Sequence, residues 1–292
     1  MGGLVKAANR GLVGHLSPGA RKRIAGVMGG RALAWYRRRR ADVVLVSFPA
    51  CGRTWLRVML GRALQAHYGL PAEADVVELH HLAELDARVP NVLVTHDDDP
   101  QWRRPEEVGR DKSAYRHQRV LLLVRDPRDA VVSLYHHKTG RRAAFAGTLA
   151  EFLDEPVGSI GSLLAFYDAW AAALGVPAAT LVVRYEDLHA RPEDELRRVL
   201  AFAGVGDVAD ATVTAAVDYG SFANMRRLEE AGTAASDKLR PVRAGDPASY
   251  KTRRGTVGGH RDELTPDQVA HLDRLVADSP GAARLGYGAA GS

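Results

Sequence analysis

The sequence lacks features that would place it in several common protein classes. It contains a single cysteine, Cys51, among 292 residues, which excludes an internal disulfide and any cysteine-cluster metal site. No run of 18 or more apolar residues occurs, so we expect no membrane-spanning helix. No uninterrupted apolar segment precedes a small-residue cleavage site near the N-terminus, so a reducing, cytoplasmic setting is the default expectation.

Acidic residues are absent from the first 40 positions, which carry ten lysines and arginines. The remaining 252 residues hold 30 basic and 35 acidic side chains, so the overall charge of +5 combines a strongly basic arm with a slightly acidic body. We therefore divide the chain into a basic N-terminal arm, residues 1–40, and a domain, residues 41–292. Three uses remain open for the arm: peripheral contact with an anionic membrane, contact with another partner, or a solvated extension.

Short apolar segments alternate with helical segments along the rest of the chain. Strands are predicted at residues 42–48, 91–95, 119–124 and 180–184. Helices are predicted at residues 54–67, 127–137, 163–174, 192–203, 209–217, 222–230 and 266–278. Residues 231–255 have no periodicity and are predicted to form a long loop. This alternation predicts an α/β fold whose mostly parallel sheet is covered on both faces, with ligands beyond the carboxyl ends of the strands.

The first candidate site is the turn after the first predicted strand, Ser47-Phe48-Pro49-Ala50-Cys51-Gly52-Arg53-Thr54-Trp55. A tight glycine-containing turn between a buried strand and a helix directs free backbone N–H groups and the positive end of the helix toward an anion. Arg53 adds a charge and Thr54 a hydroxyl donor. The Gly-x4-Gly-Lys-Ser/Thr spacing of a nucleotide-triphosphatase P-loop is absent. Considered alone, the segment is also compatible with an ordinary strand-to-helix turn.

Two further segments carry arginines where an anion could bind. Arg125 ends a predicted strand, and Ser133 lies two turns into the following helix; the guanidinium matches phosphate bidentately, although an ion pair with Asp129 is the structural alternative. The segment Arg253-Arg254-Gly255 lies at the end of the long loop. It could clamp an anion, or it could simply be solvated.

The order and spacing of the three segments resemble those of the cytosolic-type sulfotransferases. The family's Tyr-Pro-Lys-Ser-Gly-Thr-Thr-Trp turn is matched by residues 48–55, and its Arg-x-Pro-x-Asp-x-x-x-Ser motif by Arg125, Pro127, Asp129 and Ser133. Its late Arg-Lys-Gly-x-x-Gly motif is matched by residues 253–258. The resemblance spans about residues 42–276 and implies a three-layer α/β/α fold similar to that of P-loop NTPases. The abundance of Ala, Arg and Gly suggests a bacterial member.

The resemblance also implies a cofactor, 3′-phosphoadenosine-5′-phosphosulfate (PAPS), and roles for individual residues. The 5′-phosphosulfate is expected at Cys51, Gly52, Arg53 and Thr54. The adenine is expected against Trp55, Phe222 and Tyr185, with Ser221 beside them. The 3′-phosphate of PAPS, and of its product PAP, is expected at Arg125, Ser133, Arg253, Arg254 and Gly255. No metal is implied, and the acceptor is expected to be a hydroxylated small molecule, a carbohydrate or a natural product.

Catalysis is assigned by the same resemblance to His96, which follows the strand at residues 91–95 and would accept the proton of the acceptor hydroxyl. Ala50 departs from the family pattern. Family members have a lysine at this position, and that lysine stabilises the charge that develops on the departing phosphate. Three interpretations follow: an engineered inactive variant, a naturally slow or purely PAP-binding protein, or compensation by Arg53. The intact remainder of the site favours the first. An Ala50→Lys variant is then expected to turn over at least tenfold faster.

Other interpretations remain open at this point. Asp97-Asp98-Asp99 follow His96 directly and could attract a cationic acceptor, although a solvated acidic loop is the simpler explanation. A non-catalytic PAP-binding protein on the same fold is the alternative function. A third class would bind nucleic acid or a membrane surface through residues 1–40, whereas the sulfotransferase interpretation predicts no nucleic-acid partner. The sequence indicates no oligomeric state.

Overall fold

The computed structural model describes residues 30–141, 144–231, 252 and 254–288. The chain divides into two compact units, residues 1–41 and residues 42–292. In the first unit the described element is helix α3 (Gly30–Arg40), whose last turn consists of four arginines. The Arg39 guanidinium lies 5.1 Å from the centroid of the Trp35 ring. Within the described ranges, no helix combines the length and apolar character needed to cross a bilayer.

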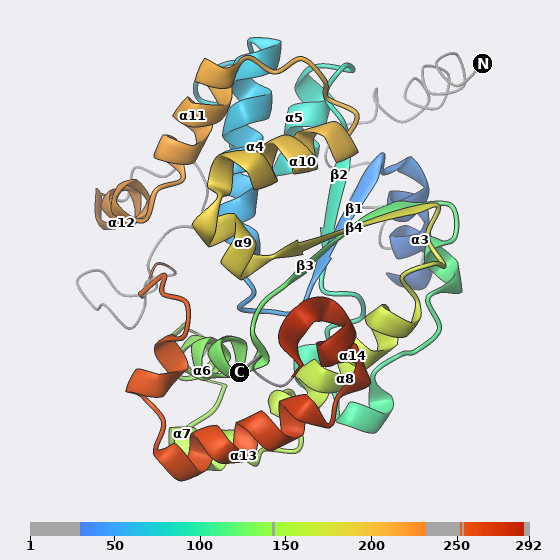
Figure 1. The fold of residues 1–292 in the computed structure, drawn as a ribbon. Coiled ribbons are helices and arrows are strands. Elements are labelled where there is room, and N and C mark those ends of the chain that lie inside the picture. The colour runs from blue at the N-terminus through green and yellow to red at the C-terminus, as the bar shows by residue number, and fades with distance from the viewer. Residues whose placement is uncertain (1–29, 142–143, 232–251, 253, 289–292) are drawn as a thin grey trace. The chain divides into compact units, whose positions relative to one another are not determined.

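The second unit is built on a sheet of four parallel strands (Figure 1). These strands are β1 (Val43–Ser47), β2 (Val92–Thr95), β3 (Arg119–Val124) and β4 (Ala179–Arg184), in the order β2-β1-β3-β4. All residues of β1 are buried, as expected for a parallel strand covered on both faces. The chain leaves β1 toward β2 on one side and returns to β3 on the other. This reversal of strand order creates a crevice at the carboxyl ends of β1 and β3.

Helices lie on both sides of the sheet (Figure 1). One side carries α4 (Arg53–Tyr68), α5 (Leu79–Leu85), α10 (Pro192–Phe202) and α11 (Asp210–Tyr219); the other carries α6 (Pro127–His136), α8 (Ile160–Ala172), α13 (Pro266–Ala277) and α14 (Pro280–Ala282). Leu56, Leu60 and Leu64 of α4 are buried against the strands, because their spacing places them on one helical face. The predicted α/β fold is therefore confirmed.

Further short elements link these layers. They are α7 (Leu149–Leu153), α9 (Tyr185–Ala190) and α12 (Phe222–Ala231), with the π-helical turns His137–Arg141 and Ala283–Tyr287 and the 3-10 turns Pro100–Trp102, Pro105–Glu107, Ser113–Tyr115 and Gly259–Asp262. At the start of α6, the Asp126 carboxylate accepts a hydrogen bond from the backbone N–H of Arg128. Pro127 is the first helical residue, which agrees with the predicted helix start. Most of the long loop predicted at residues 231–255 lies outside the described residues.

Candidate active site

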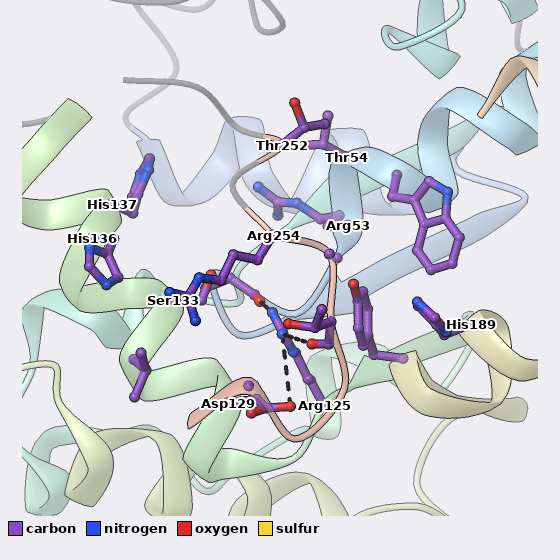
Figure 2. A pocket seen from close by; sticks show the side chains of 18 of the residues that line it. Arg53, Thr54, Arg125, Asp129, Ser133, His136, His137, His189, Thr252 and Arg254 are labelled. Carbon is purple, nitrogen blue, oxygen red and sulfur yellow. Dashed lines mark hydrogen bonds and ion pairs between the residues drawn. The ribbon is translucent and has the colours of Figure 1, made fainter. Parts of the chain in front are cut away.

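A cavity of about 350 Å³ lies where the carboxyl ends of all four strands meet (Figure 2). Each strand delivers one part of its wall: the turn after β1, His96 after β2, Arg125 after β3 and Tyr185 after β4. Predicted site residues that line it are Gly52, Arg53, Thr54, Trp55, His96, Arg125, Ser133, Tyr185, Phe222, Arg254 and Gly255, and Ala50 lines it too. Cys51 and Ser221 do not line the cavity, and Arg253 lies outside the described residues.

The turn after β1 is shaped for close approach of a ligand to the backbone. Gly52, the N-cap of α4, has φ 86°, and a Cβ there would lie 2.5 Å from Cδ2 of Tyr185. Ala50 also adopts a left-handed conformation, with φ 66°. No side chain caps the N-terminus of α4, so its first-turn N–H groups and positive dipole end suit an anion.

Cys51 points away from this cavity into the core. Its side chain is fully buried, with Sγ 3.7 Å from the hydroxyl of Tyr167 and 3.8 Å from the carbonyl oxygen of Pro49. Burial raises the pKa of the thiol to about 12, because the charged thiolate is disfavoured without water. Any part that Cys51 plays in anion binding must therefore come from its backbone.

Arg53 and His96 are joined by a short hydrogen bond. Arg53 Nη2 lies 2.6 Å from His96 Nε2, while His96 Nδ1 lies 2.8 Å from the carbonyl oxygen of Ser47. A carbonyl oxygen only accepts hydrogen bonds, so Nδ1 carries the ring proton and Nε2 accepts from the guanidinium. His96 thus presents its basic nitrogen, Nε2, to Arg53.

Arg53 remains a cation at neutral pH. Burial, together with the nearby charge of Arg57, lowers its pKa to about 10. The second terminal nitrogen of Arg53, Nη1, is buried and has no hydrogen-bond partner. An unpaired buried donor of this kind is costly unless a ligand satisfies it.

Arg125 connects the turn after β1 to residues 254–260, here called the late loop. Its Nη1 donates to the Ala50 carbonyl oxygen and its Nη2 to the Thr256 carbonyl oxygen, both at 3.2 Å. The guanidinium carbon lies 4.3 Å from the centroid of the Tyr185 ring, within cation–π range. The Nε atom of Arg125 is buried and unpartnered, so this arginine also retains an unused donor.

Asp129 holds the late loop through short hydrogen bonds and forms a longer ion pair with Arg125. Its carboxylate accepts hydrogen bonds from the backbone N–H groups of Gly258 and His260, at 2.7 and 3.0 Å, and from His260 Nδ1 at 2.7 Å. The nearest Arg125 nitrogen is 3.9 Å away. Burial disfavours the charged carboxylate, but the hydrogen bonds from His260 and Gly258 and the charge of Arg125 outweigh it, and they lower the pKa of Asp129. The second and third sequence motifs are therefore physically joined.

Aromatic rings form another part of the wall. The rings of Trp55 and Tyr185 meet edge to face at 5.5 Å, and Trp55 Nε1 donates to the Gly220 carbonyl oxygen at 2.8 Å. Trp55 also packs against two apolar clusters, so it serves both the core and the cavity. Phe222 is 44% exposed, and a Cβ on Gly255 would lie 2.7 Å from its ring. An exposed ring beside a glycine backbone is suited to stack on a planar ligand.

The remaining predicted residues have different surroundings. Ser133 lines the cavity from α6. Arg254 pairs with Asp262 and Glu263, at 3.3 and 3.6 Å. The exposed Ser221 instead accepts a hydrogen bond at its Oγ from the backbone N–H of Asn224, at 3.4 Å, so it acts at the start of α12.

Four histidines on the wall were not among the predicted site residues: His136, His137, His189 and His260. His136 pairs with Glu263 at 2.5 Å, and His260 is buried on Asp129. The spacing of His136 and His137 after Ser133 could have revealed two of them, because residues three and four apart share a helical face. Among the described residues, no group of His, Cys, Asp and Glu is arranged to hold a metal ion.

Each of the three aspartates after His96 has a partner within the chain; Asp99 accepts a hydrogen bond from Gln101 Nε2 at 3.1 Å. Asp97 accepts hydrogen bonds from Lys112, Tyr115 and Trp170, at 2.6, 2.6 and 3.0 Å. Asp98 pairs with Arg103 at 2.7 Å. None of the three lines the cavity, so they give no support to a cationic acceptor, and Asp97 is not part of a solvated loop.

Comparison with known proteins agrees with this geometry. A family model for the sulfotransferase domain matches residues 40–282. Cytosolic sulfotransferase 14 of Arabidopsis thaliana is 25% identical, with 81% of this chain and 74% of the relative covered. Sulfotransferase 6B1 of Danio rerio is 24% identical, with 85% and 83% covered.

Solved structures give the same fold. The mouse sulfotransferase SULT7A1 in complex with PAP superposes with a TM-score of 0.59 at 21% identity, covering 89% of this chain and 94% of that one. Retinol dehydratase in complex with androsterone and PAP gives 0.55 at 15% identity, covering 82% and 80%. The chain belongs to the sulfotransferase domain family.

Proposed function

We propose that this sulfotransferase moves a sulfuryl group from PAPS to a hydroxyl of a small acceptor. The observation that carries the proposal is the pair formed by Arg53 and His96, a cation and a base in hydrogen-bond contact at the cavity wall. The mouse and retinol dehydratase structures that share the fold contain PAP, and the latter also contains androsterone, which supports a hydroxylated small molecule as acceptor. The names of the Arabidopsis relatives support a cytoplasmic setting.

The residues of the cavity fit such a donor. Two arginines, Arg53 and Arg125, retain buried donors without partners, and phosphate or sulfate oxygens would satisfy them. Gly52 and Gly255 have positive φ and leave no room for a Cβ, so the backbone is bare where the ligand would lie. We assign the phosphosulfate to the turn from Cys51 to Thr54 through its backbone N–H groups and Arg53.

The rest of the donor is assigned to the other walls. The adenine would lie against Trp55, Tyr185 and Phe222, whose rings border the cavity. Ser221 is retained beside the adenine from the sequence prediction. The 3′-phosphate would bind Arg125, Ser133, Arg254 and the backbone of Gly255, with Arg253 retained from the sequence prediction.

The chemistry assigned to the chain's own residues is proton removal and charge stabilisation. PAPS supplies the sulfuryl group. His96 Nε2 accepts the proton from the acceptor oxygen as that oxygen bonds to sulfur, while Nδ1–H holds the ring on Ser47. The bond from sulfur to the phosphate oxygen breaks, and Arg53 stabilises the charge left on that oxygen.

Arg53 can supply the positive charge that a lysine at position 50 would otherwise provide. Its guanidinium reaches the base from the first turn of α4, so a cation lies beside the reaction centre although Ala50 has none. This contact supports compensation by Arg53 over the two other interpretations of Ala50.

Sulfate transfer from 35S-labelled PAPS to a panel of hydroxylated acceptors, with water as the baseline, tests the proposal. His96→Gln should abolish transfer while PAP affinity, measured by calorimetry, is not reduced. His117→Gln is the matched control, because His117 is exposed and its Nε2 bonds only to the neighbouring Arg116 among the contacts seen. PAP binding without transfer to any acceptor would favour the alternative, a non-catalytic PAP-binding protein. Absence of PAP binding would overturn both functions.

A further inference from the structure

The hydrogen bond from Arg53 to His96 places the base in an unproductive arrangement. The nitrogen that must take the acceptor proton, Nε2, already accepts from Arg53 Nη2 at 2.6 Å. The other ring nitrogen is held on the Ser47 carbonyl, so the ring cannot turn to offer a substitute without losing that bond. While Arg53 stays there, the lone pair that would receive the acceptor proton is occupied.

Arg53 has a second possible partner. Its Nη1 atom is buried without a hydrogen-bond partner, and its side chain lines the cavity. It also stands at the first turn of α4, where the helix has no side-chain cap. Both observations indicate an anion-binding position, independently of the contact with His96.

The competition between the two partners has a predictable outcome. A hydrogen bond from a guanidinium to a phosphate or sulfate oxygen joins opposite charges and is frequently bidentate. In the hydrogen bond from Arg53 to the neutral imidazole of His96, only the guanidinium is charged, so this bond lacks the attraction between opposite charges. An anion in the turn should therefore draw the guanidinium away from His96.

We propose that Arg53 occupies His96 Nε2 in the donor-free enzyme and releases it when the phosphate of the donor binds at the start of α4. The general base thus becomes available only in the donor-bound enzyme, and acceptor deprotonation depends on the donor being present. This inference rests on the proposed function, because it assigns the donor to that turn. One guanidinium then serves both as the switch on the base and as the stabiliser of the leaving oxygen.

Nuclear magnetic resonance on protein labelled with 15N-histidine and 15N-arginine tests this at a fixed pH, with PAP as the probe. The His96 signals are assigned by their loss in His96→Gln. Without ligand, the ring should show a protonated Nδ1, an unprotonated Nε2 and proton–proton contacts with the Arg53 side chain. Saturating PAP should remove those contacts and move the Nε2 resonance toward that of a free ring nitrogen.

Two variants separate this effect from simple proximity of the ligand. In Arg53→Gln the Nε2 resonance should already lie near its PAP-bound position, and PAP should change it little. Arg254→Gln removes another cavity cation, one that pairs with Asp262 and Glu263, and the response of His96 to saturating PAP should persist. If Arg53→Gln does not fold, the wild-type measurement still decides.

The outcomes are distinguishable from failure of the proposed function. If PAP binds by calorimetry and the contacts between Arg53 and His96 persist, this inference is overturned while the function stands. An equal response of His96 in Arg53→Gln would overturn it as well. If PAP does not bind, both fail.

Discussion

Under the proposed function, Arg53 supplies from the start of α4 the positive charge that the family's lysine would supply from position 50. Position 50 has φ 66° and lies before the helix, whereas Arg53 begins α4. An arginine is longer than a lysine and carries a planar set of donors, so from the helix start it reaches His96 and still has Nη1 unused. In the proposed mechanism the cation therefore comes from the first residue of the helix rather than from position 50.

Arg53→Ala should lower turnover about 10²–10³-fold, the usual effect of losing one preorganised donor to a developing charge. Adding Ala50→Lys to that variant should restore part of the loss, because a lysine then stands at the family's position. Both are measured as single-turnover transfer from PAPS at saturating donor. If the double variant stays as slow as Arg53→Ala, position 50 cannot supply the charge in this chain.

Cys51 should be unreactive in the folded protein. Its pKa is raised to about 12 by burial, and the thiolate is the reactive form, so iodoacetamide at pH 8 should label it quickly only in urea. Because the folded pKa lies above the unfolded value, this group's contribution to stability is complete below about pH 9 and declines as the pH rises toward 12. Urea titrations between pH 8 and 11 measure that decline; equal labelling rates with and without urea would contradict the burial.

At the scale of elements, apolar runs were enough to predict the four strands, because parallel strands covered on both faces have a nearly continuous apolar pattern. The helices α5, α7 and α9 were missed, since five to seven residues are too few to show a helical period. The direction of the Cys51 side chain could not be predicted: it faces the core, whereas its neighbours in the same tight turn line the cavity. That direction depends on φ and ψ, which the residue types do not reveal.

Gly52→Ala should damage both stability and the site. The new Cβ would meet the Tyr185 ring at 2.5 Å in a backbone with φ 86°, which adds a clash of about 1–3 kcal/mol to a left-handed cost of about 1–2 kcal/mol. Gly69→Ala, at the other end of α4, has φ 64° and open space around its Cβ, so it should pay the left-handed cost alone. Urea unfolding and PAP calorimetry compare them; a loss of PAP affinity in Gly69→Ala would contradict this account.

Asp129→Asn should loosen the late loop without unfolding the domain. The asparagine side chain has one acceptor oxygen, whereas the carboxylate offers two to the N–H groups of Gly258 and His260. A buried donor left without an acceptor costs about 1–3 kcal/mol of stability. Hydrogen exchange at residues 254–260 should speed up and PAP affinity should fall, whereas Asp273→Asn, half-exposed on α13, should change neither.

Because the pKa of Asp129 is lowered on folding, its contribution to stability exists above the unfolded pKa and is lost as the pH falls through the folded value. Hydrogen exchange of the late loop, measured at successively lower pH, reports this loss. An exchange pattern of the wild-type loop that does not depend on pH beyond the intrinsic exchange rate would argue against the role of Asp129.

At the scale of the whole molecule, net charge is a poor guide to the binding site. The domain is slightly acidic, yet its cavity is lined by Arg53, Arg125 and Arg254. Strand ends position Arg53 and Arg125, and the contacts of Arg125 and Asp129 with residues 256–260 hold the segment of Arg254 beside them, so tertiary structure concentrates the charge. The sequence could identify the motifs and their order, but the links between them, such as Asp129 to His260, depend on tertiary contacts that no local pattern encodes.

The basic arm can be separated from this chemistry by deletion. Residues 1–41 form a compact unit of their own, and the helix at its end presents four arginines beside the exposed Trp35, a combination suited to an anionic lipid surface. A chain of residues 42–292 should keep the PAP affinity and the transfer rate of the full chain. The shortened chain should lose binding to phosphatidylserine vesicles. Vesicle binding by the full chain should weaken when the salt concentration rises from 50 to about 300 mM, because exposed charges are screened within roughly 10 Å at 0.1 M.

Vesicle sedimentation and 35S transfer, measured on both chains, report vesicle binding and enzyme activity separately. Equal vesicle binding by the two chains would assign the membrane contact to the domain, and a large loss of transfer would make the arm part of the enzyme.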